Sequence, residues 1–345
     1  MSVALQGKPL VSIGLFVYNG DKHIRQALDS LLTQDYPNFE LVISDNASTD
    51  GTRDICLEYA ERDKRVHYHR SEVNMGAVRN AEKVFELSSG EYFMWAAHDD
   101  YWDPAYIRLC IETFEQNENA VLVTARHEFI NADTGDVILT NNGITTTRLN
   151  AFQRFRAIAS QRSYLGDLFY GVHKSNVVRK VLPFRKIFPT DVLFLAGISL
   201  HGDFITRPEI LTRARGGGAS SNNKRYTGSK ELHSNAFFRR YPYFGWLVAA
   251  NGIAFQSDKF KLYEKFGLAL LLTGDYMYFG IVRMAAWLHL RLQKVWPGAA
   301  SYTREMWHRA EESRRRPGGA GLKYSSHGSE SGVEIGKGGG KGTSK

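Results

Sequence analysis

The chain has 345 residues, of which 43% are hydrophobic and 12% aromatic, so it can bury a sizeable core and is not an intrinsically disordered protein. About half of its net charge of +8 lies in residues 304–345, which hold nine Lys or Arg against five Asp or Glu. The rest of the chain has no compact basic stripe, and nucleic-acid binding is therefore disfavoured.

The two cysteines, Cys56 and Cys110, form neither a CxxC pair nor a metal-binding spacing. This usage favours two buried thiols in a reducing compartment. The first ten residues lack a basic start followed by an apolar core, so we expect no signal peptide. These features predict a cytoplasmic protein.

Strand-like and helix-like patterns alternate through the first hundred residues. Apolar runs predict four strands, at residues 10–18, 39–44, 65–69 and 91–97. Apolar positions at helical spacing predict a helix in each of the three gaps between them, the first with Ile24, Ala27, Leu28, Leu31 and Leu32 on one face. Repeated β-α units of this length predict an α/β domain with a mostly parallel, Rossmann-like sheet and helices on both faces, to about residue 125.

The pattern is looser after residue 125. Two strands around an Asp-Thr-Gly turn are expected in residues 121–139, then a strand and a helix, and then a glycine-rich loop at 212–222. Residues 231–316 contain aromatic, aliphatic and basic segments that predict a helical C-terminal extension. Residues 317–345 are rich in glycine and lysine without periodicity, which predicts disorder.

Polar side chains follow three of the predicted strands. Tyr18 and Asn19 follow the first, Asp45 the second, and Asp99 with Asp100 the fourth. Ligands of parallel α/β sheets bind beyond the carboxyl ends of the strands, so these side chains are expected at one ligand-binding edge. The first strand is not followed by GxGxxG, which disfavours a dinucleotide site.

The adjacent acids Asp99 and Asp100 have two interpretations. Carboxylates before a helix can cap it, and Asp103 before Pro104 fits that role. For Asp99 and Asp100 we favour a divalent cation, Mg²⁺ or Mn²⁺, because such ions take carboxylate ligands and bridge substrate phosphates. Asp45 differs, since at a strand end it can accept N–H donors from a base or sugar.

Several motifs in order carry a family resemblance: "VSIGLFVYNGDKHIRQALDSLLTQDYPNFELVISDNASTDGT", "NMGAVRNAEKVFELSSGEYFMWAAHDDYWDP", "FPTDVLFLAGISLHG" and "TRARGGGASS". With them the chain resembles the inverting nucleotide-sugar glycosyltransferases of family 2, which have the GT-A fold. The resemblance covers about residues 8–222 and implies a catalytic domain at 1–230. Residues 8–125 would form its nucleotide-sugar-binding half and 126–230 its acceptor and catalytic half.

The resemblance also implies roles for single residues. Tyr18 and Asn19 would border the donor nucleotide, Asp45 would face its base, and Arg79 would lie beside the donor. Asp99 would be the metal ligand at the diphosphate, with Asp100 as a supporting acid.

Asp191 falls where the family has its catalytic base, although Asp191 could equally start the helix that follows as its cap. The loop from Arg213 to Ser220 would close over the diphosphate, and Arg215 would neutralise the departing group. The chain departs from the common family pattern at Ala97 and Thr190, where many members have an acid.

The apolar stretch at 266–296 is expected to break at Thr273-Gly274-Asp275 into runs too short to span a membrane. Its basic residues among aromatics fit a helix on a membrane surface. A helical pair packed on the catalytic domain or on a second copy in a homo-oligomer fits equally well.

The sequence thus predicts a metal-dependent, inverting, hexosyltransferase-type enzyme that acts on a nucleotide-diphosphate sugar and a glycan or lipid-linked acceptor. The resemblance implies a role in cell-envelope or extracellular polysaccharide biosynthesis, at the inner face of the cytoplasmic membrane. The alternatives are a nucleotidyltransferase and a catalytically inactive nucleotide-sugar-binding module at the membrane.

Overall fold

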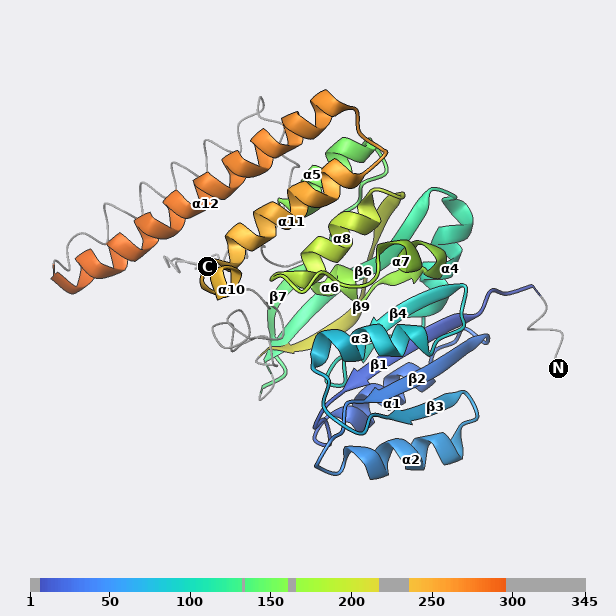
Figure 1. Ribbon diagram of the computed structural model, residues 1–345. Coiled ribbons are helices and arrows are strands. Elements are labelled where there is room, and N and C mark those ends of the chain that lie inside the picture. Colours follow the sequence, from blue (N-terminus) through green and yellow to red (C-terminus); the bar gives the residue numbers. More distant parts are fainter. Residues whose placement is uncertain (1–6, 132–133, 161–165, 217–235, 296–345) are drawn as a thin grey trace, which may run out of the picture. The chain divides into compact units, whose positions relative to one another are not determined.

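A nine-stranded sheet, β3-β2-β1-β4-β8-β6-β9-β5 with β7 beside β6, organises the chain in the computed structural model (Figure 1). The structure describes residues 7–131, 134–160, 166–216 and 236–295. The strands are β1 (Val11–Val17), β2 (Phe39–Asp45), β3 (Val66–Arg70), β4 (Tyr92–Ala96), β5 (Tyr101–Trp102), β6 (Ala120–Asn131), β7 (Val137–Asn141), β8 (Val172–Lys174) and β9 (Asp203–Gly216).

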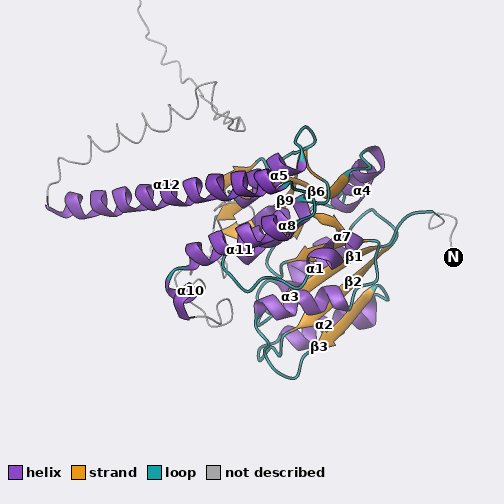
Figure 2. Ribbon diagram, turned by 45° about the horizontal axis from the view of Figure 1, so that its top comes forward, coloured by secondary structure: helices purple, strands orange, loops and turns teal. Residues whose placement is uncertain are grey.

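Helices lie on both faces of this sheet (Figure 2). They are α1 (Ile24–Leu32), α2 (Thr52–Arg62), α3 (Ala77–Glu86), α4 (Tyr106–Gln116), α5 (Ala151–Ala159), α6 (Gly166–Phe169), α7 (Ser175–Val181), α8 (Thr190–Ser199), α10 (Ala236–Arg240), α11 (Pro242–Gln256) and α12 (Leu262–Val295). Packing divides the chain into two units, Met1–Tyr278 and Phe279–Lys345, and the core described here belongs to the first.

The predicted β-α repeat of the N-terminal half is confirmed. Strands β1, β2, β3 and β4 pair in parallel, and the register sets Val17 beside Asp45 and Asp45 beside Arg70. Each predicted strand agrees with its observed bounds to within one residue at either end. The carboxyl ends of these strands therefore share one edge of the sheet.

Strand β4 shows how the sequence builds a core on each face. Because side chains alternate along a strand, Phe93 and Trp95 pack against α3 and α8, whereas Met94 and Ala96 pack against α1 and α4. Gly14 on the neighbouring strand is required here, since a Cβ at that position would lie 2.5 Å from the Phe93 ring. The fully buried Trp95 indole donates to the Ala81 carbonyl at 2.9 Å.

Two segments differ from the sequence-based expectation. The predicted loop at 212–222 is wrong for its first part, because residues up to Gly216 continue strand β9 and pair along β6. The ladder hydrogen bonds to β6 account for this extension. The remainder of that loop, like the predicted disordered tail, lies outside the described residues.

The predicted break at Thr273-Gly274-Asp275 is also wrong, because α12 continues through it as a single helix. One glycine in a helix costs only about 1 kcal/mol, and Leu268 with Leu272 is fully buried against the core of the first unit. None of the helices in the described part of the chain is long and apolar enough to cross a membrane.

Candidate active site

The loop after β1 is held against the loop after β2 by a set of backbone and side-chain hydrogen bonds. The Asn19 N–H donates to Ser48 Oγ at 2.9 Å, and Asn19 Oδ1 accepts from the Thr49 N–H at 2.8 Å. Asn19 adopts φ 54°, a backbone conformation that Asn tolerates better than most residues. Tyr18 beside it is 45% exposed, so its ring is available to a ligand at this edge.

Asp45 lies at the same edge but is fully buried. Its carboxylate accepts from the Ser48 N–H at 2.8 Å and from the Tyr68 hydroxyl at 2.7 Å, and the Arg70 guanidinium lies 3.5 Å away. Both oxygens of Asp45 thus bind the protein itself and hold the end of β2 to the end of β3. Tyr68 and Arg70 were not predicted as site residues, although the strand-end rule applied to the third strand would have found Arg70.

The acidic turn after β4 packs on the loop after β1. A Cβ at Gly20 would lie 2.6 Å from the His98 ring, so glycine permits this close approach. Burial lowers the pKa of His98, while the Asp99 charge acts in the opposite direction and His23 adds to the lowering. His98 is therefore a partly buried, neutral neighbour of Asp99 that the sequence did not single out.

Asp99 and Asp100 are both partly buried at this turn. No group of three or more His, Cys, Asp or Glu side chains arranged for a metal is found among the described residues. A magnesium-type ion does not need such a group, because it keeps several waters and is held by one or two carboxylates together with substrate phosphates.

Arg215 lies two residues beyond Arg213 on β9. Strand β5, which follows the acidic turn, pairs with β9 in antiparallel register, with Tyr101 opposite Arg213. The Arg215 guanidinium donates to Gln26 Oε1 of α1, so it already projects toward the first β-α unit. It lies on a strand rather than in the loop that the sequence predicted.

Asp191 lies in the first turn of α8 and is partly buried. The helix begins at Thr190 after Pro189, and no side chain caps it, so Asp191 is not the helix cap considered from the sequence. Burial raises the pKa of its carboxyl. Because α8 ends just before the start of β9, its first turn is directed toward the carboxyl edge of the sheet.

Arg79 is not brought to the strand-end residues. Its guanidinium forms two hydrogen bonds to Glu86, of 2.6 and 3.0 Å, and lies 3.4 Å from Glu82 on the same helix. Its side chain therefore runs along α3 and pairs with carboxylates.

A small cavity of about 10 Å³ adjoins the acidic turn and includes Asp100 in its lining. His127 of β6 lines it as well, with Nδ1 on Thr212 Oγ1 at 2.8 Å and with Nε2 buried without a hydrogen-bond partner. Burial lowers the pKa of His127 to about 4. Sequence reasoning missed this histidine because nothing in its strand distinguishes it from a core position.

Comparison with known families identifies the family of the part of the chain that carries these strand ends. The profile of glycosyl transferase family 2 matches residues 12–179. Residues 12–179 belong to glycosyl transferase family 2. The α/β fold with its C-terminal helical region agrees with the GT-A fold expected from that family.

Curated relatives are glycosyltransferases of bacteria. TuaG of Bacillus subtilis, named for teichuronic acid biosynthesis, is 40% identical over 95 residues, which is 28% of this chain and 38% of TuaG. An uncharacterized glycosyltransferase of Haemophilus influenzae is 25% identical over 61% of this chain and 67% of its own length. The matches to the first three relatives span 36% to 38% of their lengths.

Solved structures support the fold. Residues 1–349 of TarS from S. aureus superpose with a TM-score of 0.56 at 15% identity, covering 79% of this chain and 72% of that one. The same protein in complex with UDP-GlcNAc gives a TM-score of 0.59 at 16% identity, with 79% and 73% covered.

Proposed function

We propose that the protein transfers a sugar, of hexosyl type, from a nucleotide-diphosphate donor to a glycan or lipid-linked acceptor with inversion. The observation that carries this proposal is the pairing of β5 with β9 beside the end of β4. It supports a site in which the acidic turn of Asp99 and the cationic Arg215 serve the edge where the loops of Asn19 and Asp45 meet. Opposed carboxylate and guanidinium groups at a sheet edge suit a diphosphate with a bound cation.

The donor would bind along this edge. Tyr18 and Asn19 border the nucleotide, and the loop held by Asp45 presents the base-binding side. Asp45 acts mainly by fixing that loop, because both of its oxygens already accept hydrogen bonds from the protein. Arg79 would have to break its ion pair with Glu86 to bind a donor phosphate. It would therefore contribute to donor binding only if the diphosphate, with its higher charge, attracts it more strongly than Glu86 does.

The residues present fit a divalent cation. Two partly buried carboxylates, Asp99 and Asp100, follow one strand, and hard oxygen ligands of this kind suit Mg²⁺ or Mn²⁺. We assign Asp99 as the protein ligand, with Asp100 supporting it. A bound cation would supply positive charge beside the diphosphate, and Arg215 supplies a second positive charge from β9.

Asp191 is the proposed catalytic base. Its raised pKa makes it a better proton acceptor than an exposed aspartate once it is ionised. It would take the proton of the acceptor hydroxyl as that oxygen attacks the anomeric carbon. The bond to the diphosphate breaks on the opposite face, and a single displacement inverts the anomeric centre.

The names of relatives support the choice of substrates to test. TuaG is named for teichuronic acid biosynthesis, which supports an acceptor in a cell-envelope or extracellular polysaccharide. UDP-GlcNAc is the ligand named for a TarS structure, which makes UDP-sugars the first donors to test. Action at the inner face of the cytoplasmic membrane, through peripheral contact, is part of the proposal. It is supported by the large exposed hydrophobic side chains of α10, α11 and α12.

Donor turnover tests the proposal. We expect a UDP-, GDP- or dTDP-sugar to stabilise the protein against heat with Mn²⁺ present, and slow metal-dependent release of the nucleoside diphosphate. Formation of a nucleoside triphosphate and a sugar 1-phosphate from the same donor and added pyrophosphate would instead support a nucleotidyltransferase. Tight donor binding without any turnover, in the presence of acceptor, would support an inactive binding module.

A further inference from the structure

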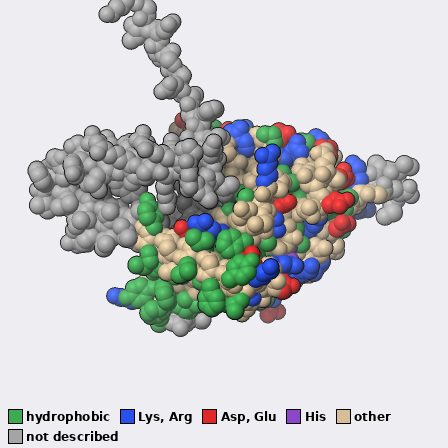
Figure 3. Space-filling view, turned by 90° about the horizontal axis from the view of Figure 1, so that it is seen from above, with side chains coloured by type: hydrophobic (Ala, Val, Ile, Leu, Met, Phe, Trp, Pro, Cys, Tyr) green, Lys and Arg blue, Asp and Glu red, His purple; other side chains and the backbone are tan. Residues whose placement is uncertain are grey.

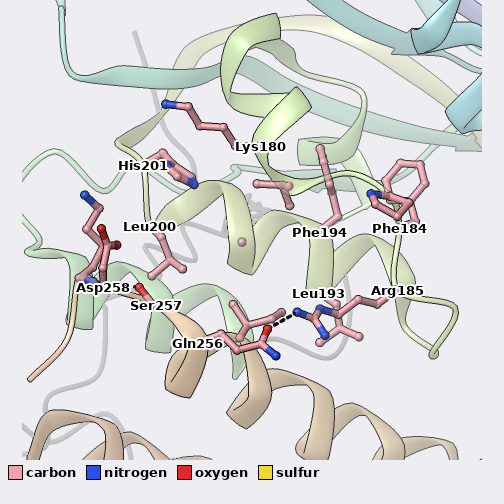
Figure 4. Close-up of a pocket in the computed structure, with 15 residues that line it drawn as sticks. Lys180, Phe184, Arg185, Leu193, Phe194, Leu200, His201, Gln256, Ser257 and Asp258 are labelled. Carbon is pink, nitrogen blue, oxygen red and sulfur yellow. Dashed lines mark hydrogen bonds between the residues drawn. The ribbon is translucent and has the colours of Figure 1, made fainter. Parts of the chain in front are cut away.

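A cleft of about 280 Å³ lies along α8 (Figure 4), and Asp191 is not among the residues that line it. Its walls come from α7, the turn before α8, α8 itself and the end of α11. Among the residues that line it are Lys180, Phe184, Arg185, Phe194, His201 and Lys259.

The cationic end of this cleft is remote from the candidate active site. Lys180 and His201 lie near one another past the last turn of α8, whereas Asp191 lies in its first turn (Figure 4). Nine residues of α-helix separate position 191 from position 200, a rise of about 14 Å. The cleft is therefore a second site and no extension of the donor site.

The charges of the cleft favour an anion. Lys180, Arg185 and Lys259 carry positive charge, against the single acid Asp258. No ion pair links any of these three cations to a carboxylate in the part of the chain that the structure describes. Arg185 is oriented by a hydrogen bond of 3.1 Å to Gln256 Oε1, shown as a dashed line in Figure 4.

The pKa of His201 is affected by the same positive charges. Burial lowers its pKa first, and the charges of Lys180 and Lys259 lower it further, while Asp258 acts in the opposite direction. The two lysines therefore act on one small region of the cleft rather than as separate surface charges.

Beneath this cationic rim the cleft is apolar. Phe184, Leu193 and Phe194 are buried and face its interior. These side chains also pack in the core of the first unit, so only their edges are offered to a ligand. A charged head group attached to an apolar body would contact both the rim and these edges.

Exposed hydrophobic side chains continue from the cleft onto α11 and α12. Phe255, beside Gln256, is 38% exposed and meets the Phe266 ring edge-on at a centroid distance of 5.6 Å. On α12 an apolar stripe is formed by residues at helical spacing with exposures of 55% to 75%: Leu262, Phe266, Leu270 and Met277. The opposite side of α12 buries Leu268 and Leu272 in the core.

This surface is unusual for a soluble monomer. Hydrophobic side chains gather in one region of the surface in Figure 3. Large contiguous apolar patches on soluble proteins mark partner or membrane contacts. An apolar stripe beside a cationic cleft is the combination that binds anionic bilayers.

We propose that the cleft binds the phosphate head group of an anionic membrane lipid while the apolar stripe of α12 enters the membrane interface. This inference rests on the membrane contact of the proposed function and does not depend on sugar transfer. Lys180 and Lys259 recognise the phosphate, and the apolar stripe contacts the acyl region. Asp191 is not among the residues that line the cleft, so a lipid bound there leaves its carboxyl free.

Vesicle binding by the full chain tests the inference. The probe is vesicles of phosphatidylcholine with and without phosphatidylglycerol, measured by co-sedimentation. The cleft variant is Lys180→Gln with Lys259→Gln. The control is Lys186→Gln with Lys261→Gln, which removes equal charge at neighbouring exposed positions outside the cleft. We expect the cleft variant to lose about tenfold or more in affinity for anionic vesicles, and the control to change by about twofold or less.

Three outcomes would overturn the inference. Equal losses in both variants would show non-specific attraction. Stabilisation against heat by inorganic phosphate, lost in the cleft variant and without vesicle binding, would assign the cleft to a soluble phosphate. A dimer that dissociates in Leu270→Ser, again without vesicle binding, would assign the stripe to a second copy of the chain.

Donor turnover by the same variants separates this inference from the proposed function. We expect the cleft variant to release nucleoside diphosphate at the wild-type rate. If vesicle binding depends on the cleft but the protein turns over no donor, the lipid site is supported and the proposed enzyme activity is contradicted.

Discussion

The Tyr68 hydroxyl donates a hydrogen bond of 2.7 Å to Oδ2 of Asp45 and so ties strand β3 to the last residue of β2. The other oxygen of Asp45 accepts the Ser48 N–H at 2.8 Å, which shapes the loop that also holds Asn19. A carboxylate without solvent exposure thus organises a surface loop. Burial and the negative charge of Asp45 both raise the pKa of Tyr68, so its hydroxyl remains a proton donor at neutral pH.

Tyr68→Phe should weaken donor binding while the protein stays folded. Loss of a hydrogen bond to a charged group costs about 1.5–3 kcal/mol, and part of this appears as loosening of the Ser48 loop. We expect about a tenfold higher Kd for the nucleotide sugar, measured by calorimetry.

Tyr59→Phe is the matched control for Tyr68→Phe. The Tyr59 hydroxyl donates to Asp29 at 2.6 Å, between α2 and α1 rather than at a strand end. It should lower the melting temperature to a similar degree and leave the donor Kd unchanged. If both substitutions raised the donor Kd equally, the proposal that Asp45 shapes the donor-binding loop would be contradicted.

Asp99→Asn should reduce metal-dependent activity. The change keeps the side-chain volume but removes the charge that would hold Mg²⁺ or Mn²⁺ beside the diphosphate. We expect kcat/KM to fall about 100-fold or more, and EDTA to have little further effect on the variant. Asp103→Asn is the control, because Asp103 accepts the Ala105 N–H at 2.9 Å in the turn before α4. Wild-type metal-dependent activity in Asp99→Asn would contradict the assignment.

Asp191→Asn should abolish transfer without loss of stability. Removal of a general base costs about 100- to 10,000-fold in rate. Its raised pKa means that the folded protein binds the proton more tightly than the unfolded chain. Ionised Asp191 therefore destabilises the fold above its folded pKa, and this cost disappears at acid pH below the unfolded pKa.

Two measurements check the Asp191 prediction. At neutral pH the melting temperature of Asp191→Asn should equal or exceed that of the wild type, and the difference should shrink on acidification. As the pH is lowered, the rate of transfer by the wild type should begin to fall at a higher pH than it would if the base were an exposed aspartate with an ordinary pKa. Full activity in the Asn variant would rule out Asp191 as the base.

Acidification should destabilise the fold through two buried histidines. Burial lowers the pKa of His127 and of His173 to about 4, against about 6.5 in the unfolded chain. Between these values the unfolded chain binds more protons, so stability falls as the pH falls. Linkage gives a loss of about 2 kcal/mol for each histidine at about pH 5, measurable by urea unfolding.

The exposed His67 provides the comparison for this pH effect. His67→Gln removes an imidazole that is 49% exposed, so it tests whether burial of the ring is required for the effect. His127→Asn should reduce the loss of stability between neutral and acid pH by about half. An unchanged slope in His127→Asn would contradict the burial of a neutral imidazole on β6.

The local sequence pattern was sufficient to predict the strands and helices of the first half of the fold and most of the residues at the strand ends. Alternating and continuous apolar runs identified β1 to β4 because side-chain period follows backbone geometry. The local pattern failed at 212–216, where polar residues, an alanine and one glycine extend β9, because the long partner strand β6 cannot be recognised from local sequence. It failed again at Thr273-Gly274-Asp275, where packing of Leu268 and Leu272 supports the helix through its weakest turn.

The sequence by itself determined that Asn19, Asp45 and Asp99 lie at or just after the ends of predicted strands, because strand ends are encoded by a few consecutive residues. Only the tertiary structure decided what surrounds them. It buries Asp45 beside Tyr68 and directs the Arg215 guanidinium to Gln26 of α1. These contacts join residues 23 and 189 positions apart, and their energies depend on packing and pairing that no local pattern contains.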